Sequence, residues 1–421
     1  MHDKDITRIS KEIEKYLEIS GRINKLKDNK YWYPLSMANY GIEEIIESLK
    51  SLITFQTSMS NKTIEFEKNF ANYLNCNETI MVNSGSSADL LLAHLLVDPL
   101  NKQIDKDSEV LVPVVTWPTH IWSIMNAGLK PKLVDVDPKT LNIDLVDLKN
   151  KITKSTKALF IVHLMGNPCN MDEINNLVVK NNLILLEDAC EALGSEWDNK
   201  KVGTFGLGGS FSFFFSHHMT TMEGGLVCCS SPEIADQLRI LRAHGWLRNL
   251  KSNKYSINDK NVDSRYAFIN WGFNLRPTEL QAGFGIEQLK KLPNFNKKRK
   301  TLSDIFFKYI DDSKYFDRPH VENKSNPSWF ALPCLIKSDA PFSKDDFVKY
   351  LEYNGVETRP IVTGNIAKHP VANVFSHIFE DTYKGADIIH NNGFYVGLSP
   401  LFNETQIIKL IDIFKKFESK Y

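Results

Sequence analysis

The chain has few cysteines, and they form no recognisable pattern. Its 421 residues contain six, with no C-x-x-C pair and no spaced cluster of histidine and cysteine. This argues against a disulfide framework and against zinc or iron–sulfur ligands, and we expect no metal site. Because free cysteine is usually buried, we expect buried thiols at Cys76, Cys169, Cys190, Cys228, Cys229 and Cys334.

Long apolar runs and an excess of either charge are also missing. The longest apolar stretches, such as DLLLAHLLV, are far shorter than a bilayer span, and the charged N-terminus MHDKDITRISKEIEKYLEIS has no apolar signal region. The 51 basic residues balance 51 acidic ones, so no overall field favours nucleic acid or an anionic membrane. We expect a cytoplasmic protein without nucleic-acid or membrane partners.

The chain does contain an alternation of short apolar runs and helical patterns between about residues 60 and 230. The runs are too short for buried helices, and Gly, Pro, Asn or Asp bound them, as is typical of strands in a largely parallel sheet. This alternation predicts a three-layer α/β/α domain, with ligands beyond the carboxyl ends of the strands. The predicted strands are 79–82, 109–115, 131–137, 157–164, 183–188, 209–215 and 225–229.

Changes in composition and hydrophobic pattern divide the chain into three predicted parts. Residues 1–40 form an N-terminal extension, in which a polar amphipathic helix is followed by the basic turn KLKDNK. Residues 41–288 form the large domain. Residues 289–421 form a smaller α+β domain, entered through the charged helix LKKLPNFNKKRKTLSD. No internal repeat or low-complexity tract is present.

A candidate phosphate site follows the first predicted strand, in NSGSSADLLLAHLL. Gly85 lets the backbone turn tightly, and the free N–H groups of Ser86 and Ser87 at a helix N-terminus suit a phosphate. A plain helix cap accounts for the same residue types. This pattern alone leaves both interpretations open.

Two further side chains stand at predicted strand ends. Trp117, in TWPTH, belongs either to the core or to a stacking surface for a planar ligand. Asp188, in EDACEALGS, follows four aliphatic residues, where a carboxylate is costly unless it meets a cation or hydrogen-bond donors. A cap for the next helix is the alternative.

The order of these features, continued by Ser212, His217 and the motif EGG, resembles fold-type-I pyridoxal-phosphate enzymes. It resembles specifically the DegT/DnrJ/EryC1/StrS sugar aminotransferase family, whose members modify nucleotide-linked 4-keto sugars. The likeness covers about residues 33–421. It rests on NSGSSA, VTWPT, DVDPKTLNID, HLMGNPCNMDEI, EDACEALGS, GTFG, SFSFFFSHH, EGG and GFNLRPTELQAGFG.

One position departs from the usual family pattern. In most members, the residue six before the glutamate of EGG is a lysine that holds the cofactor through a Schiff base, whereas this chain has His217. A histidine cannot form that bond, yet it is a competent base near neutral pH. The 3-dehydratase branch of 3,6-dideoxysugar biosynthesis shares this replacement, and SHHMTTMEGG, RAHGWLRNL, GIEQLKKLP, PSWF and RPIVTGN resemble it.

The resemblance implies removal of the C3 hydroxyl from a nucleotide-linked 4-keto-6-deoxyhexose, first of all GDP-4-keto-6-deoxy-D-mannose. Pyridoxal or pyridoxamine 5'-phosphate would be bound without a covalent link, L-glutamate would be the amino donor, and a homodimer would share its sites. His217 would be the base, and Asp188 would pair with the ring nitrogen. The other implied cofactor contacts are Gly85, Ser86 and Ser212 at the phosphate, Asn274 from a partner subunit, Trp117 on the ring face and Glu191 near the ring hydroxyl.

Four more residues are candidates for substrate or donor binding. Arg248 and Arg276 suit a carboxylate or phosphate clamp, although either can equally form a structural ion pair. His218 and His244 would tune His217 or bind sugar, and a structural role stays open for both.

Three alternative functions remain. The first is an enzyme like the CDP-4-keto-6-deoxyglucose 3-dehydratases but without their iron–sulfur cluster, because LKSNKYSINDKNVDSRYAF contains no cysteine. The second is an ordinary aminotransferase that uses another lysine, although none occurs between Lys201 and Lys251. The third is a non-catalytic sensor of nucleotide sugars. Such a sensor should lose Asp188, Trp117 and the phosphate serines, which this chain keeps.

Overall fold

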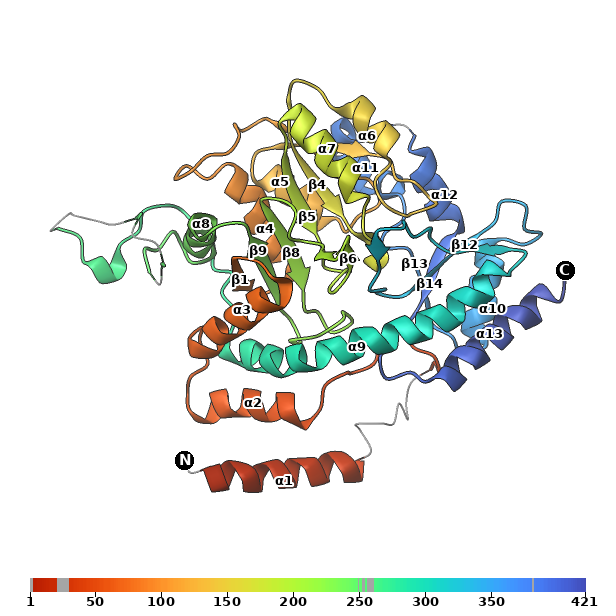
Figure 1. Cartoon of the computed structure of the whole chain (residues 1–421), viewed down its shortest axis with the longest axis horizontal. Coiled ribbons are helices and arrows are strands. Elements are labelled where there is room, and N and C mark those ends of the chain that lie inside the picture. Colours follow the sequence, from red (N-terminus) through yellow and green to blue (C-terminus); the bar gives the residue numbers. More distant parts are fainter. Residues whose placement is uncertain (1–2, 21–29, 249, 252–253, 256–260, 381) are drawn as a thin grey trace.

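All seven predicted strands belong to one sheet in the computed structural model (Figure 1). The structure describes residues 3–20, 30–248, 250–251, 254–255, 261–380 and 382–421. In sheet order the strands are β1 (Glu78–Val82), β9 (Gly225–Cys229), β8 (Gly208–Ser212), β5 (Ile184–Asp188), β4 (Thr156–Val162), β2 (Glu109–Pro113) and β3 (Lys130–Val134).

The sheet is largely parallel, as predicted, with one antiparallel strand. The pairs β5–β8, β4–β5, β2–β4 and β2–β3 are parallel, whereas β9 is antiparallel to both β8 and β1. β9 follows β8 after a loop of 12 residues, 213–224. This loop contains no helix, whereas a parallel pair is usually joined by a helical crossover.

Helices cover both faces of the sheet and complete the predicted three layers. Alternate strand residues face opposite ways, so Ile80, Val110 and Phe160 pack with one helix layer, while Met81 and Leu159 pack with the other. The first layer contains α4 (Gly85–Leu96), α5 (Thr119–Asn126) and α8 (Pro232–Arg242). The second contains α3 (Asn61–Leu74), α6 (Leu145–Lys151), α7 (Met171–Asn181) and the start of α9 (Glu279–Asp311).

The C-terminal part has its own core and is reached through α9. The predicted boundary at residue 289 falls inside this helix. Its sheet is antiparallel, β10-β12-β14-β13, and α9 and α13 pack against it. The elements are β10 (Phe316–Asp317), β12 (Leu332–Ile336), α10 (Lys344–Tyr353), β13 (Thr358–Pro360), α11 (Val371–Val374), α12 (Lys384–Asn392), β14 (Gly393–Val396) and α13 (Glu404–Glu418).

Smaller elements tie the parts together. A three-stranded sheet, β11 (Ser325–Asn326), β6 (Glu196–Trp197) and β7 (Lys200–Lys201), joins a C-terminal segment to the large domain. Tyr33, in the expected N-terminal extension, is fully buried in the C-terminal core and donates to the Gly397 carbonyl at 2.9 Å. The 3-10 turns are Leu164–Gly166, Ser264–Tyr266, Ile366–Lys368 and Ser376–Ile378.

The amphipathic N-terminal helix is α1 (Asp3–Ser20), which lies along α2 (Ile42–Ile53), and α2 in turn lies along α9 (Figure 1). Most of the predicted basic turn KLKDNK lies outside the described residues. None of the helices in the described part of the chain combines the length and apolar content that a bilayer crossing requires.

The six cysteines are all free, and four are buried, as predicted. Cys76 and Cys190 are only half-buried, which corrects the expectation for these two.

Candidate active site

The carboxyl ends of the strands bring the predicted site residues to one edge of the sheet. Asp188 is the last residue of β5, and Ser212 is the last residue of the neighbouring β8. Trp117 lies in the turn between β2 and α5, and its indole is 58% exposed. This edge is where open α/β sheets bind ligands.

Gly85 and Ser212 are in contact at this edge, and this contact explains the glycine. A Cβ at residue 85 would lie 2.6 Å from the Ser212 Cβ and 3.2 Å from the Cys190 Sγ. We predicted that glycine is needed here for a tight turn. Gly85 is instead the first residue of α4, and glycine is needed because Ser212 comes so close to it. A larger residue would fill the space between the α4 N-terminus and the Ser212 hydroxyl.

The helix-cap and phosphate interpretations turn out to be compatible. The Ser84 hydroxyl caps α4 by accepting from the Ser87 N–H at 3.1 Å. The N–H groups of Gly85 and Ser86, in the first turn, have no acceptor within the helix. They are therefore available to an anion, together with the Ser212 hydroxyl.

The loop 213–224 carries His217 to the same edge. It begins after Ser212 and ends at Gly225, where a side chain would overlap the carbonyl group of Ser84. Inside the loop, the Phe213 N–H donates to the Gly224 carbonyl at 2.9 Å, and the His217 N–H donates to the Phe214 carbonyl at 3.0 Å. The second glycine of EGG thus lets β9 pass beside the N-terminus of α4.

Asp188 has the buried partner that its position predicted, and that partner is His120. The His120 Nε2 lies 2.8 Å from the Asp188 Oδ2, and both side chains are buried. Burial works against both charges, but each group favours the charged form of the other. The pKa of Asp188 is therefore lowered, and that of His120 is raised.

The sequence analysis missed the rest of this network. The Asp89 Oδ1 lies 3.7 Å from the His120 Nε2 and accepts from the Ser210 hydroxyl at 2.6 Å. Burial raises the pKa of Asp89 to about 7. The Thr116 hydroxyl contacts the His120 Nδ1. A single acid inside the apolar helix ADLLLAHLL was the available signal for a buried partner.

Asp89, His120 and Asp188 are close enough together to serve as metal ligands. Their polar atoms, however, already lie within hydrogen-bond or ion-pair distance of other protein atoms, among them the His120 Nε2 beside Asp188 and the His120 Nδ1 beside Thr116. The other two carboxylate oxygens of the cluster also accept hydrogen bonds. The Asp188 Oδ1 accepts from the Cys190 N–H at 2.6 Å, and the Asp89 Oδ2 accepts from the Thr119 hydroxyl at 3.3 Å. We therefore interpret the cluster as an ion-pair network and not as a metal site.

Glu191 lies in the turn after Asp188 and holds the backbone of residue 165. Its Oε2 accepts from the Met165 N–H at 2.9 Å. Burial raises the pKa of Glu191 to about 7, and the neighbouring charge of Asp188 acts in the same direction. This carboxyl group is thus partly protonated near neutral pH, so it can both donate and accept a hydrogen bond.

His217 is half-buried between two aromatic rings. The ring centroid of Phe330 lies 5.2 Å away in an edge-on arrangement, and that of Phe214 lies 6.2 Å away. Its Nδ1 is buried and has no hydrogen-bond partner among the described residues. Burial, reinforced by the Arg299 cation, lowers the pKa of His217 to about 4. The imidazole is therefore neutral at pH 7 and able to accept a proton.

His218, the second histidine of the loop, makes a structural contact. It is fully buried, and its Nε2 donates to the Ser328 carbonyl at 2.9 Å. Its main-chain carbonyl accepts from the Asn39 side chain at 3.4 Å. In this chain His218 anchors the loop that presents His217.

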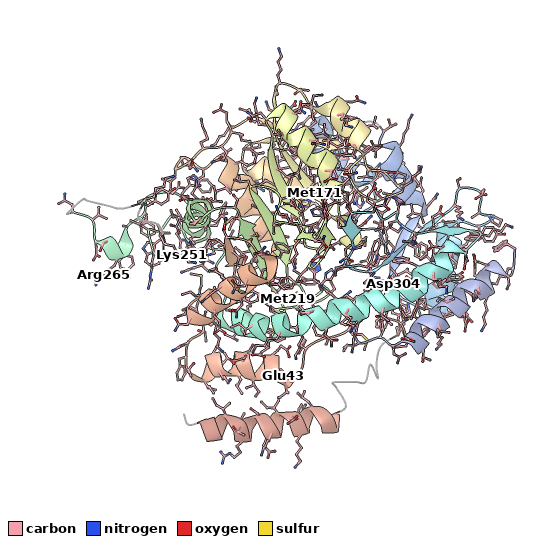
Figure 2. The ribbon with its side chains drawn as sticks, viewed as in Figure 1. Glu43, Met171, Met219, Lys251, Arg265 and Asp304 are labelled. Carbon is pink, nitrogen blue, oxygen red and sulfur yellow. The ribbon has the colours of Figure 1, made fainter. Side chains whose placement is uncertain are left out.

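Four candidate residues form a second group on the segment between α8 and α9. The Arg276 Nε donates to the Asn274 Oδ1 at 2.9 Å, and the Arg276 Nη2 lies 3.4 Å from the His244 Nε2. Arg248 lies over the Trp246 ring at 4.9 Å. Among the described residues, no hydrogen bond or ion pair joins His244, Arg248, Asn274 or Arg276 to Asp188 or His217. Their segment projects from the body: Lys251 lies close to α8, where it pairs with Glu78, and Arg265 lies farther out (Figure 2).

A cavity of about 330 Å³ lies on this second group. Arg239 and Arg242 line it but are neutralised by Glu78, Asp236 and Glu67. Arg248 and Arg276 also line it, and neither has an ion-pair partner among the described residues. This cavity is therefore suited to an anion.

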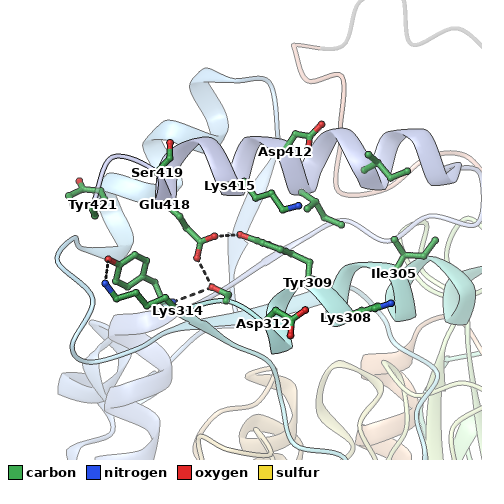
Figure 3. A pocket seen from close by; sticks show the side chains of 14 residues that line it. Ile305, Lys308, Tyr309, Asp312, Lys314, Asp412, Lys415, Glu418, Ser419 and Tyr421 are labelled. Carbon is green, nitrogen blue, oxygen red and sulfur yellow. Dashed lines mark hydrogen bonds between the residues drawn. The ribbon is translucent and has the colours of Figure 1, made fainter.

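Another cavity, of about 760 Å³, lies elsewhere, and none of the predicted site residues lines it (Figure 3). It is a groove between the end of α9 and α13. Glu418 accepts there from the Tyr309 hydroxyl at 2.5 Å and from the Ser313 hydroxyl at 2.6 Å. These hydrogen bonds join the two helices, so Glu418 has a structural role.

The first group of residues fits pyridoxal or pyridoxamine phosphate. Gly85, Ser86 and Ser212 leave free donors and room for a phosphate, because a side chain at residue 85 would fill that space. Asp188 keeps a negative charge that suits a protonated ring nitrogen, and the Trp117 indole is exposed at the same edge. A covalent link to residue 217 is excluded, because a histidine stands there.

Comparison with known proteins gives the same family. The family model described as the DegT/DnrJ/EryC1/StrS aminotransferase family matches residues 39–415. GDP-4-keto-6-deoxy-D-mannose 3-dehydratase of Yersinia pseudotuberculosis is 36% identical over 91% of this chain and 98% of its own length. The enzyme of the same name from Escherichia coli O55:H7 is 38% identical over 87% and 95%, respectively.

A solved structure is also similar over nearly its whole length. It is the crystal structure of GDP-4-keto-6-deoxymannose-3-dehydratase with a trapped PLP-glutamate geminal diamine. It is 36% identical, has a TM-score of 0.86 and covers 90% of this chain and 99% of that one. With a family match over most of its length and two relatives above 30% identity, this chain belongs to the DegT/DnrJ/EryC1/StrS aminotransferase family.

Proposed function

We propose that this chain is a pyridoxal/pyridoxamine phosphate-dependent 3-dehydratase of a nucleotide-linked 4-keto-6-deoxyhexose, with GDP-4-keto-6-deoxy-D-mannose as the substrate. One observation carries the proposal: the position where most of the family has a lysine is His217, whose pKa burial lowers to about 4, on the loop that follows Ser212. The activity of the two named relatives supports the same reaction.

Each residue of the site has a proposed task. Gly85, Ser86 and Ser212 bind the phosphate, and Trp117 covers the ring face. Asp188 stays ionised and balances the protonated ring nitrogen, because His120 supports its charge at 2.8 Å. The bound cofactor supplies an amino group for the 4-keto carbon and a ring that withdraws electrons.

His217 performs the proton transfer. As a neutral imidazole on the loop after Ser212, His217 would serve as the base of the reaction, and as an imidazolium it would return a proton to the C3 hydroxyl that leaves as water. A lysine at this place would compete by binding the cofactor covalently. We propose L-glutamate as the donor that restores the amino group, as the PLP-glutamate adduct of the similar structure suggests.

The central test is the reaction itself. The purified chain is given pyridoxamine phosphate and, in separate samples, the GDP-linked and CDP-linked 4-keto-6-deoxy sugars, and ammonia release is followed. We expect release with the GDP-linked sugar and a loss of at least about 100-fold in His217→Asn, which removes the general base. Release only with the CDP-linked sugar would favour the alternative substrate, and no release with either would overturn the proposed function.

A second test separates the dehydratase from an aminotransferase. Borohydride reduces a Schiff base between lysine and cofactor to a stable bond, which mass spectrometry detects. We expect no labelled peptide from the wild type and a labelled residue 217 in His217→Lys, which should also lose dehydration. A cofactor–lysine bond in the wild type would disprove the assignment of His217.

We also propose that two copies of the chain form a homodimer with shared sites. In the described part of the chain, no hydrogen bond or ion pair joins Asn274, Arg248, Arg276 or His244 to Asp188 or His217. The first three line an arginine-rich cavity, and His244 lies beside Arg276. Exposed aromatic side chains lie on the same projecting segment and on the His217 loop, as an interface requires. They are Tyr266, Phe268, Trp271, Phe214 and Phe215.

Mixing two inactive variants tests this sharing. Asp188→Asn removes the cofactor partner, and Arg248→Ala removes the residue proposed to reach into the second site. If sites are shared, dissociating and reassociating the two variants together restores about a quarter of wild-type activity, since half of the dimers then hold one intact site of two. Light scattering gives the oligomeric state. A monomer, or no recovery on mixing, would contradict the proposal.

A further inference from the structure

Arg299 is a buried cation that meets no carboxylate in the described part of the chain. It lies on α9 and is 3% exposed. Its Nη1 donates to the Phe330 carbonyl at 3.0 Å and also to the Leu398 carbonyl, while its Nε is buried without a partner. No Asp or Glu of the described residues forms an ion pair with it. A buried charge with only neutral acceptors is expensive, so its retention points to a task.

The segment Ser328–Phe330 joins Arg299 to the two adjacent histidines. The Ser328 carbonyl accepts from the His218 Nε2 at 2.9 Å. The Phe330 ring packs edge-on against the His217 ring, while the Phe330 carbonyl accepts from Arg299. Three residues of the PSWF motif thus place one cation beside both imidazoles.

The charges around His217 can be named from each element packed against it. Arg299 comes from α9, Asp188 comes from β5, and His218 is its neighbour in the loop. Burial and Arg299 lower the pKa of His217 to about 4, whereas Asp188 acts in the opposite direction. The pKa of His218 is lowered well below its ordinary value, again by burial first and then by Arg299. The rings nearest to His217, Phe330 and Phe214, carry no charge.

Burial lowers the pKa of Arg299 itself to about 9, so the guanidinium stays charged at neutral pH. A proton on His217 would therefore lie near a permanent positive charge in a poorly hydrated place. The neutral imidazole is favoured, and its ring is held by the aromatic contact.

We propose that Arg299 is a positioning residue for His217: through its buried charge and its hold on the Ser328–Phe330 segment, it keeps the imidazole neutral and in place to accept a proton. This inference rests on the proposed function for its catalytic meaning. Its structural basis does not depend on substrate or cofactor: Arg299 holds the Phe330 carbonyl, and the Phe330 ring packs against His217.

The test follows the His217 ring by nitrogen NMR in the uniformly labelled full-length chain, with His217→Asn to assign its signals. In the wild type we expect the ring to stay neutral until about pH 4. In Arg299→Met, which removes the charge, and in Arg299→Gln, which keeps one donor for the carbonyls, the midpoint should rise toward the ordinary imidazole range. Lys298→Met, at an exposed position one residue away on α9, should leave it unchanged.

Two results would overturn the proposal. One is a midpoint in either Arg299 variant equal to that of the wild type. The other needs no variant: it is a wild-type His217 that titrates in the ordinary imidazole range, and it applies even if both variants fail to fold. Neither measurement uses substrate or cofactor, so failure of the proposed function would not imitate failure of this inference. With substrate, kcat/KM falls toward low pH as the base is protonated. The pH at the midpoint of this fall should be higher in the same Arg299 variants and unchanged in Lys298→Met.

Discussion

At the residue scale, the site depends on charges buried together more than on any one side chain. Asp188 was recognisable because a carboxylate after an apolar strand needs a partner. His120 belongs to the same short motif as Trp117, TWPTH, yet nothing in the sequence showed that it would face Asp188. Two carboxylates and one imidazole meet only because β5 ends, and α4 and α5 begin, at the same edge of the sheet.

Replacing His120 tests this network. His120→Gln leaves Asp188 and Asp89 buried side by side without a cation, and the loss of one partner of a buried pair costs about 3 kcal/mol or more. We expect lower stability in urea and weaker cofactor binding, because Asp188 then favours its protonated form. The control is His377→Gln, at an exposed position. Cofactor binding equal to that of the wild type would exclude His120 from the support of Asp188.

A substitution at Gly85 tests the close approach at the proposed phosphate site. Gly85→Ala places a methyl group 2.6 Å from the Ser212 Cβ, and such overpacking costs about 1–3 kcal/mol. We expect reduced stability and a higher Kd for pyridoxamine phosphate. Ser212→Gly should recover the stability in the double variant but not the affinity, since the hydroxyl is lost. Equal stability of Gly85→Ala and wild type would show that the site is looser than the structure indicates.

At the element scale, one carboxylate holds the turn that leads into β8. Glu187, next to Asp188, is fully buried and accepts from the backbone N–H groups of Gly203, Phe205 and Gly206 at 2.6 to 2.8 Å. Its Oε2 also lies 3.2 Å from the His163 Nε2. The GTFG motif is thus a loop wrapped around an acid. The sequence analysis assigned Glu187 no role. Adjacent strand residues face opposite sides of the sheet, so Glu187 does not belong to the site around Asp188.

Glu187→Gln tests this clamp. An amide offers one oxygen where the carboxylate offered two, and its NH₂ group faces backbone donors. We expect a loss of about 3 kcal/mol in the free energy of unfolding, since charged hydrogen bonds are lost and donors are left unpaired. Hydrogen exchange at residues 203–206 should accelerate. Unchanged exchange there would show that the turn holds its shape without the acid.

At the scale of the whole molecule, buried groups with opposite pKa shifts should partly cancel in the pH dependence of stability. The pKa of His217 is lowered from 6.5 to about 4. Between these two pH values the unfolded chain therefore binds a proton at His217 that the folded chain does not bind. The pKa of Glu191 is raised from 4.5 to about 7, so the folded chain keeps a proton that the unfolded chain releases. Difference curves against single variants separate the two contributions.

Urea unfolding between pH 4 and pH 7.5 gives these curves. Relative to His217→Asn, the wild type should lose stability as the pH falls from 6.5 to 4. Relative to Glu191→Gln, it should lose stability as the pH rises from 4.5 through 7. Curves with the opposite slope, or flat difference curves, would contradict the burial of these groups.

The sequence by itself determined the strands, the layer order and the chemical character of the site. Each strand is a short apolar run between turn residues. Such a run is too short for a buried helix, so it favours a strand in a sheet that is covered on both faces. The replacement of lysine by His217 is likewise a fact of the sequence, because covalent chemistry depends on residue type.

Only the tertiary structure decided which buried groups meet. The antiparallel course of β9, the contact of Gly85 with Ser212 and the support of Asp188 by His120 and Asp89 all join residues distant in the chain. The cation of Arg299 beside His217 is a further case, since 82 positions separate them. Local pattern carries no information on such pairs, because their energy arises only when packing removes water from between them.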